Sequence, residues 1–200
     1  MVEKPYSPAC ERNREPILAV LLEHFADRRQ VLEIGSGTGQ HAVHFAAALP
    51  QLNWQCADRA PYLPGIRAWL DEAALPNTPA PLALDVNGAF PEALFDAVYS
   101  ANTLHIMSAA EVELLFAKLP AVLGDDAVLS IYGPFRYDGQ HTSASNVAFD
   151  ASLRSGNPAS GIRDFEWIDA LASAIGLRLV EDRAMPANNR CLIWQRGANR

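Results

Sequence analysis

The stretch VLEIGSGTGQ, residues 31–40, constrains the fold more than any other part of the chain. Three apolar residues and one carboxylate run directly into three glycines spaced two apart. A short apolar run that ends in glycine is typical of a buried strand, and the next residues have helical character. A strand, a glycine-rich turn and a helix in this order form a site for an anion or a nucleotide. The stretch therefore predicts an α/β fold with a ligand at this turn.

The rest of the chain alternates between strand-like and helical segments. We expect strands at 31–34, 52–58, 80–85, 95–102, 127–133, 177–185 and 190–196. We expect helices at 41–49, 65–75, 109–123, 146–154 and 164–176. This order predicts an α/β sandwich with a seven-stranded, mainly parallel sheet, helices on both faces and a C-terminal antiparallel hairpin. Ligands of such sheets bind at the carboxyl ends of the strands.

Two helix starts can be predicted from local signals, one near residue 7 and one near residue 108. Ser7 and Pro8 form a helix-start signal, and Pro16 would cost a continuous helix one hydrogen bond. We therefore expect a short turn at 7–13 and a separate helix at 16–26. Ser108 and Glu111 form a capping box for the helix at 109–123, which Gly124 should close.

The domain organisation is predicted to be simple. No linker or repeat is visible, so residues 1–200 form one domain, with a lid and helix at 1–26. The polar segment 134–160 exceeds normal loop length, which favours a functional insertion near the acceptor site.

Charge and composition exclude several classes of partner. The formal net charge is −7 and no run of Lys or Arg occurs, which disfavours nucleic acid and anionic membranes. No apolar run approaches ~20 residues, and residues 1–15 lack the apolar core of a secretory signal. Three cysteines, Cys10, Cys56 and Cys191, are far apart, so we expect no disulfide, no zinc site and a reduced cytoplasmic setting. His41 and His44 lie three apart without a third ligand nearby, so no metal site is expected.

The spacing of the glycines separates the common nucleotide motifs. Gly35, Gly37 and Gly39 give G-x-G-x-G, whereas the dinucleotide fingerprint is G-x-G-x-x-G, and Gln40 stands where its third glycine would be. No G-K-[ST] follows, which excludes a phosphate-cradling P-loop. Asp58 ends the second strand and can accept both ribose hydroxyl hydrogens, a signal shared by many nucleotide-binding folds.

The stretch resembles the first motif of class I S-adenosylmethionine-dependent methyltransferases, in which E/D-x-G-x-G-x-G follows two apolar residues. The resemblance implies S-adenosylmethionine as cofactor and S-adenosylhomocysteine as its product, with a carboxylate beside the positively charged methionine part. It also implies that Asp85 bonds the adenine amino group while the Val86 N–H reaches a ring nitrogen. The expected cofactor-binding residues are Glu33, Gly35, Ser36, Gly37, Gly39, Asp58, Asp85, Val86 and Asn102.

The longer pattern resembles a family of uncharacterised methyltransferase-like proteins from bacteria and animals, a domain-of-unknown-function group. Its landmarks are KPYSPACERNREPIL, VLEIGSGTGQHAVHFA, NTLHI, IYGPF, HTSASNVAFD, IRDFEWIDAL and AMPANN. The resemblance implies a methyl acceptor over the ends of the fourth and fifth strands. There His105 and Tyr132 are the expected catalytic residues, and the expected substrate-binding residues are Tyr6, Arg12, Asn13, His141 and Asn188.

The nature of the acceptor stays open at the level of the sequence. The Asn/Asp-Pro-Pro-Tyr/Phe stretch of amino-methyltransferases that act on DNA or glutamine is missing after Asn102, which favours a small molecule methylated at O, N or S. One rival is a noncatalytic S-adenosylmethionine-binding protein with a regulatory or partner-binding role. A second rival is an NAD-dependent oxidoreductase, against which Glu33 and Gln40 argue. The chain is expected to be a monomer or a homodimer.

Overall fold

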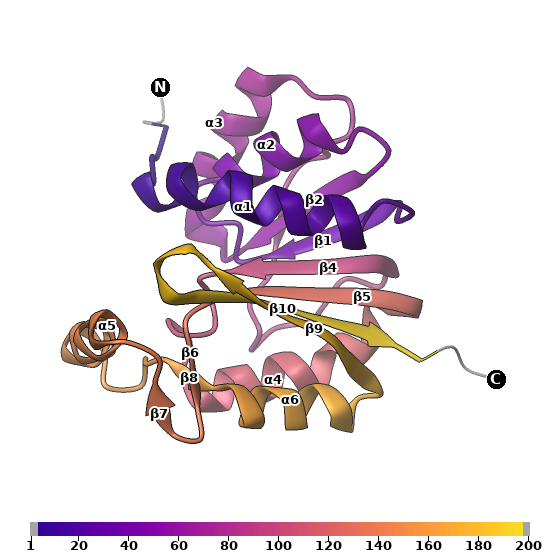
Figure 1. Cartoon of the computed structure of the whole chain (residues 1–200). Coiled ribbons are helices and arrows are strands. Elements are labelled where there is room, and N and C mark those ends of the chain that lie inside the picture. Colours follow the sequence, from indigo (N-terminus) through magenta and orange to yellow (C-terminus); the bar gives the residue numbers. More distant parts are fainter. Residues whose placement is uncertain (1–3, 198–200) are drawn as a thin grey trace.

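The computed structural model describes residues 4–197 and shows a seven-stranded sheet between two layers of helices (Figure 1). The strand order is β3-β2-β1-β4-β5-β10-β9. β10 runs antiparallel to both of its neighbours, and the other paired strands are parallel. The bounds are β1 Gln30–Ile34, β2 Asn53–Asp58, β3 Leu82–Ala83, β4 Phe95–Ala101, β5 Leu123–Gly133, β9 Leu177–Met185 and β10 Asn189–Arg196. The predicted sheet and its C-terminal hairpin are thus confirmed.

The two faces of the sheet are covered by different helices. α1 (Pro8–His24), α2 (Gln40–Ala48) and α3 (Leu63–Ala73) cover one face, and α4 (Ala109–Lys118) and α6 (Phe165–Ala174) cover the other (Figure 1). Two separate clusters of buried apolar residues fill the layers. Successive strand residues alternate between them, so Ile131 belongs to the α4/α6 side and Tyr132 to the α1 side. Short 3-10 turns lie at Ala60–Tyr62, Leu119–Ala121 and Pro186–Asn188.

The order of the strands places a switch point between β1 and β4. The chain moves outward from β1 through β2 to β3, then returns to β4 on the other side of β1. Ligands of open parallel sheets bind at the carboxyl ends of the strands beside such a point. The glycine turn after β1 and the residues after β4 therefore flank the place where a ligand is expected.

The predicted insertion at 134–160 has structure of its own. β6 (Phe135–Tyr137), β7 (Gln140–His141) and β8 (Arg163–Asp164) form a small three-stranded sheet. α5 (Ala144–Gly156) follows β7 and corresponds to the short helix expected at 146–154. Ser143 begins this helix, because its hydroxyl accepts a hydrogen bond from the Asn146 N–H at 3.1 Å. Figure 1 shows α5 standing beside the main body rather than under the large sheet.

Several predicted boundaries are wrong for physical reasons. Pro16 lies inside the continuous helix α1, because Asn13, Ile17, Val20 and Leu21 form one buried face across it, and this burial outweighs the lost hydrogen bond. Gly124 belongs to β5 rather than to the end of a helix, since α4 stops at Lys118. The predicted strand 80–85 is reduced to two residues. The capping box at Ser108 is confirmed.

Two further points concern the described chain as a whole. Within residues 4–197, no helix combines the length and the apolar character needed to cross a membrane. The ends of the predicted domain, residues 1–3 and 198–200, lie outside the described residues.

Candidate functional site

The three glycines of the turn after β1 serve two different purposes. All have positive φ, at +76° for Gly35, +58° for Gly37 and +89° for Gly39, so side chains would be strained at each. A Cβ at Gly35 would meet the Thr103 side chain at 2.5 Å, and one at Gly39 would meet the backbone of Ile66 at 3.1 Å. A Cβ at Gly37 would meet nothing within 4 Å. Gly35 and Gly39 thus allow close packing, and Gly37 alone borders open space.

The Glu33 carboxylate lies beneath the turn rather than beside its open side. It is 2% exposed, and Oε2 accepts a hydrogen bond from Trp54 Nε1 at 2.9 Å. Burial raises the pKa of Glu33 to about 7. Ser36 is also turned inward, since its hydroxyl accepts from the Ala57 N–H at 3.1 Å. Strand alternation points the Glu33 side chain into the core of the α1 side, so its expected contact with a ligand stays a prediction.

Asp58 stands at the open glycine. One carboxylate oxygen accepts from the Gly37 N–H at 2.7 Å, and the other accepts from the Arg59 N–H at 2.7 Å. Partial burial raises the pKa of Asp58, while the Gly37 N–H acts in the opposite direction. Each oxygen keeps a second lone pair for a further donor such as a ribose hydroxyl.

A hollow of about 640 Å³ continues from the end of β2 to the end of β3. Its walls include Arg59 and Tyr62 on one side and Asp85 on the other. Oδ1 of Asp85 accepts from the Asn87 N–H at 2.8 Å, and this bond lowers the pKa of Asp85. The exposed Tyr62 ring lies 5.4 Å from the Arg59 guanidinium carbon, which provides a flat surface in the hollow.

The carboxyl end of β4 leads into a second group of predicted site residues. Asn102 has φ +56°, a conformation that asparagine tolerates, and its N–H donates to the Tyr132 carbonyl at 2.9 Å. A Cβ at Gly133 would lie 3.7 Å from His105 Nδ1 and 4.0 Å from Asn102 Oδ1. Asn102 and His105 are therefore brought together over the bare end of β5.

His105 is held in a neutral state. Its side chain is 6% exposed, and burial, together with the charge of Arg163, lowers its pKa to about 4. The Phe149 ring of α5 lies edge-on, with ring centroids 5.3 Å apart. Arg163 donates to the carbonyls of Leu104, Met107 and Ala159, so this cation fixes the turn that carries His105.

Tyr132 belongs to the opposite face of the sheet from His105. Its neighbours are on α1 and β10: burial raises its pKa, whereas the Asn13 side chain and the charge of Arg12 lower it. Asn13 Oδ1 is 2.7 Å from His41 Nε2, and His41 Nδ1 is 3.3 Å from the Tyr99 hydroxyl. The buried His41 thus links Asn13 of α1 to Tyr99 of β4, two partners that are far away along the chain.

The other predicted substrate residues are scattered around α5 and α1. The Asn188 carbonyl accepts from Asn146 Nδ2 at 3.1 Å, which ties the β9–β10 turn to α5. His141 Nε2 lies 3.7 Å from a carboxylate oxygen of Asp150, which belongs to α5. Tyr6 is 61% exposed and follows Pro5, whose carbonyl accepts from Trp69 of α3. Within residues 4–197, no hydrogen bond or ion pair joins Asn188, His141 and Tyr6 to one another, so their roles stay predictions.

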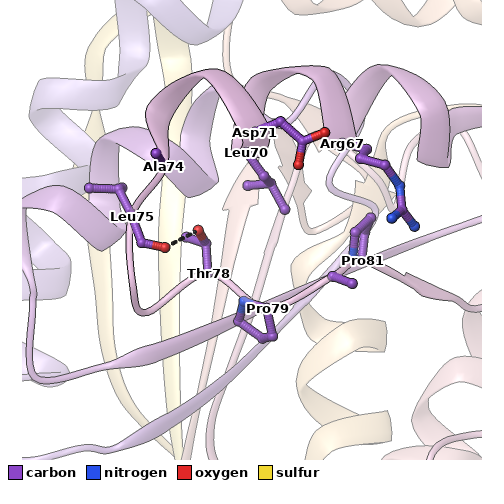
Figure 2. Close-up of a pocket in the computed structure, with 9 residues that line it drawn as sticks. Arg67, Leu70, Asp71, Ala74, Leu75, Thr78, Pro79 and Pro81 are labelled. Atoms are coloured by element: carbon purple, nitrogen blue, oxygen red, sulfur yellow. Dashed lines mark hydrogen bonds between the residues drawn. The ribbon is translucent and has the colours of Figure 1, made fainter.

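Two other features lie apart from the strand ends. A groove of about 410 Å³ between α3 and the segment 74–81 contains Arg67, Asp71 and Thr78, whose hydroxyl donates to the Leu75 carbonyl (Figure 2). None of the predicted site residues lines this groove. Among the described residues, Glu23, His24 and Glu181 form a group of potential metal ligands, but Arg183 bonds both carboxylates and supplies the positive charge there.

Similar folds occur in solved methyltransferase structures. An O-methyltransferase family protein from Burkholderia thailandensis is 21% identical with a TM-score of 0.84, over 96% of this chain and 58% of that one. The S-adenosylmethionine-dependent methyltransferase SibL is 23% identical with a TM-score of 0.79, over 94% and 56%. PigF, solved with SAH, is 12% identical with a TM-score of 0.77, over 90% and 55%. The chain therefore has the class I methyltransferase fold and spans just over half the length of these proteins.

The family itself is shown by the sequence as a whole. Residues 4–196 match the family described as "Protein of unknown function (DUF938)", and the chain belongs to it. The expected resemblance to a methyltransferase-like family of unknown function is thereby confirmed.

Proposed function

We propose that this protein binds S-adenosylmethionine and transfers the methyl group to a small-molecule acceptor at oxygen, nitrogen or sulfur. The observation that carries the proposal is the open space over Gly37, with the Asp58 carboxylate at its N–H. A nucleoside fits this arrangement, because the hollow begins at Arg59, the residue after Asp58, and reaches Asp85 beside the carboxyl ends of β2 and β3. No pyrophosphate is needed to explain the turn, which lacks the dinucleotide spacing of glycines.

The residues of the turn and the hollow would divide the cofactor between them. Gly37 leaves room for the amino-acid part, Asp58 accepts from ribose hydroxyls, and Asp85 with the Val86 N–H reads the adenine edge. Gly35, Gly39, Ser36 and Glu33 act through the shape of the turn, since their own atoms are packed or bonded within the protein. When bound, the cofactor supplies a methyl group on a positively charged sulfur.

The acceptor would lie beyond the ends of β4 and β5. His105 is neutral above a pKa of about 4, so its imidazole can accept a hydrogen bond from an acceptor O–H, N–H or S–H and orient it, while the lowered pKa makes it a weaker base than an ordinary histidine. Asn102 lies next to His105 and can orient either this imidazole or the acceptor. We keep Tyr132 and the residues Tyr6, Arg12, Asn13, His141 and Asn188 as proposed contacts around the entrance from the α1 and α5 sides.

Ligand binding can be tested with two glycine-to-valine variants at positions of equally strained backbone, Gly37 and Gly176. Calorimetry should show heat with S-adenosylhomocysteine and none with NAD. Gly37→Val should abolish this heat, because the side chain enters the open space. Gly176 is the control, since it also has positive φ, +82°, with nothing within 4 Å of a Cβ, but it precedes β9. Heat with NAD alone, or equal binding by both variants, would contradict the proposal.

Turnover then separates an enzyme from the noncatalytic alternative. Purified protein is incubated with labelled S-adenosylmethionine and pools of phenols, carboxylic acids, amines and thiols, and label in the acceptor fraction is measured. Oxygen acceptors are the first choice, because the Burkholderia thailandensis protein of similar fold is named as an O-methyltransferase family protein. Binding without transfer to any pool would favour the regulatory role.

We also propose a cytoplasmic protein that is a monomer or a homodimer.

A further inference from the structure

The last residue of α4 is bonded to the turn that follows β3. Lys118 Nζ donates to the carbonyls of Val86 and Gly88, each at 2.6 Å. Its ammonium group also lies 5.8 Å from the centre of the Phe90 ring. One partly buried cation thus engages three positions of a short segment 28 to 32 residues away. Ordering a lysine side chain costs entropy, so such a double contact indicates a defined task for it.

The same turn is held from within. Oδ1 of Asp85 accepts from the Asn87 N–H at 2.8 Å, and the Asp85 carbonyl accepts from the Gly88 N–H at 2.8 Å. Glu111, also of α4, lies 3.5 Å from Asn87 Nδ2. Residues 85–88 are therefore clamped between their own aspartate and α4.

The sheet itself does little to fix this turn. β3 has only two residues and is an edge strand, so few ladder hydrogen bonds reach position 85. The turn nevertheless lines the hollow opposite Arg59 and Tyr62, where a purine would have to be read. Rigidity therefore has to come from the bonds within the turn and from α4, where Lys118 makes the two shortest contacts.

We propose that Lys118 is a positioning residue that holds the 85–88 turn in the shape that selects adenine. This inference rests on the proposed function. Adenine presents an amino donor beside a ring nitrogen that accepts, which suits the Asp85 carboxylate next to the Val86 N–H. Hypoxanthine presents a carbonyl oxygen in place of the amino group, which a carboxylate repels. The Asp85 carboxylate and the Val86 N–H can bond adenine together only while the turn keeps the two groups side by side.

The clamp can be tested without any ligand. Hydrogen exchange of residues 84–90 is compared for the wild type, Lys118→Met, and Arg178→Met. Methionine keeps an unbranched stem but cannot donate, and Arg178 is an exposed cation on β9 whose removal changes the net charge equally. Exchange at Asn87 and Gly88 should be at least ~10-fold faster in Lys118→Met, because their hydrogen bonds open more often. Unchanged exchange would overturn the clamp.

Selectivity is tested with two nucleosides. Wild type should bind S-adenosylhomocysteine more tightly than S-inosylhomocysteine, and Lys118→Met should weaken the first by roughly tenfold while changing the second far less. Lys118→Arg, which keeps the donors, should restore part of the preference. An equal loss for both nucleosides, or no loss, would overturn the role in adenine selection. Wild-type protein that binds neither would refute the proposed function and this selectivity, while the exchange result would still decide the clamp separately.

Discussion

The Gly37 N–H donates a 2.7 Å hydrogen bond to the Asp58 carboxylate, which joins the open glycine of the β1 turn to the end of β2. The contact spans 21 residues of sequence and two neighbouring parallel strands. Asp58 therefore shapes the empty turn as well as offering its remaining lone pairs to a ligand. A substitution at this position should affect both the turn and binding.

The first prediction concerns this aspartate. Asp58→Ala should weaken S-adenosylhomocysteine binding by roughly 1.5–3 kcal/mol, because a charge-assisted hydrogen bond is lost. Asp58→Asn should have a smaller effect, since its amide oxygen can still accept from Gly37. Calorimetry measures both affinities, and Asp71→Ala on the outer side of α3 is the control. Wild-type affinity in Asp58→Ala would show that the nucleoside lies elsewhere.

The second prediction concerns the state of His105. Its imidazole should titrate near pH 4 by NMR, because burial and the nearby Arg163 disfavour the charged form. Once an acceptor is known, His105→Ala should lower turnover by roughly 10²–10⁴-fold while cofactor affinity changes little. His24→Ala on the far end of α1 is the histidine control. Full turnover in His105→Ala would remove this residue from the reaction.

The third prediction follows from the buried Glu33. Its folded-state pKa of about 7 exceeds the ordinary 4.5, so the folded protein holds this proton more tightly than the unfolded chain does. The resulting stability is complete below about pH 4.5 and is lost as the pH rises to about 7. Relative to Glu33→Gln, wild type should lose on the order of 3 kcal/mol between pH 4.5 and 8.

Urea unfolding at several pH values measures this difference. Glutamine keeps an oxygen for Trp54 Nε1 but carries no charge, so the variant isolates the ionisation. Glu113→Gln, at an exposed position of α4, should keep the wild-type dependence on pH. Parallel curves for wild type and Glu33→Gln would contradict the raised pKa.

The fourth prediction concerns residues 4–15, which belong to the lid and helix expected at 1–26. In the structure, residues 8–15 are the first turns of α1, and residues 4–7 are tied to α2 and α3 through Lys4–Glu72 and Ser7–Gln40. We therefore expect slow hydrogen exchange in 8–15 even without ligand, and further protection of 4–7 when S-adenosylhomocysteine binds. Deletion of residues 1–14 should lower the melting temperature and reduce turnover. If the deletion variant is fully active, and if exchange of residues 4–7 in the full chain does not change on binding S-adenosylhomocysteine, this segment has no role as a lid.

The sheet was predictable because its central strands are buried on both faces and therefore appear as apolar runs. The glycine turn was equally visible, since positive φ leaves glycine as the least strained residue there. The motif did not reveal on which face Glu33 lies, although its Trp54 partner is one strand away. Successive residues of a strand point to opposite faces of the sheet. This alternation could have shown that Tyr132 points away from the face on which Gly133 meets His105. Lys118 carried no signal, because its two carbonyl partners are backbone atoms about 30 residues away.

The position of β10 affects the order in which the fold can be completed. Cys191, Leu192, Ile193 and Trp194 are fully buried and line both apolar clusters, yet they are among the last described residues to be synthesised. Until residue 196 has been made, β5 has an open edge and β9 has no partner in the sheet. At about 5–20 residues per second, a ribosome would leave the edge of β5 open for about 3–13 s and β9 without its partner for about 0.5–2 s. Nascent chains stalled before β10 should therefore recruit chaperones, and release of the complete strand should end that interaction.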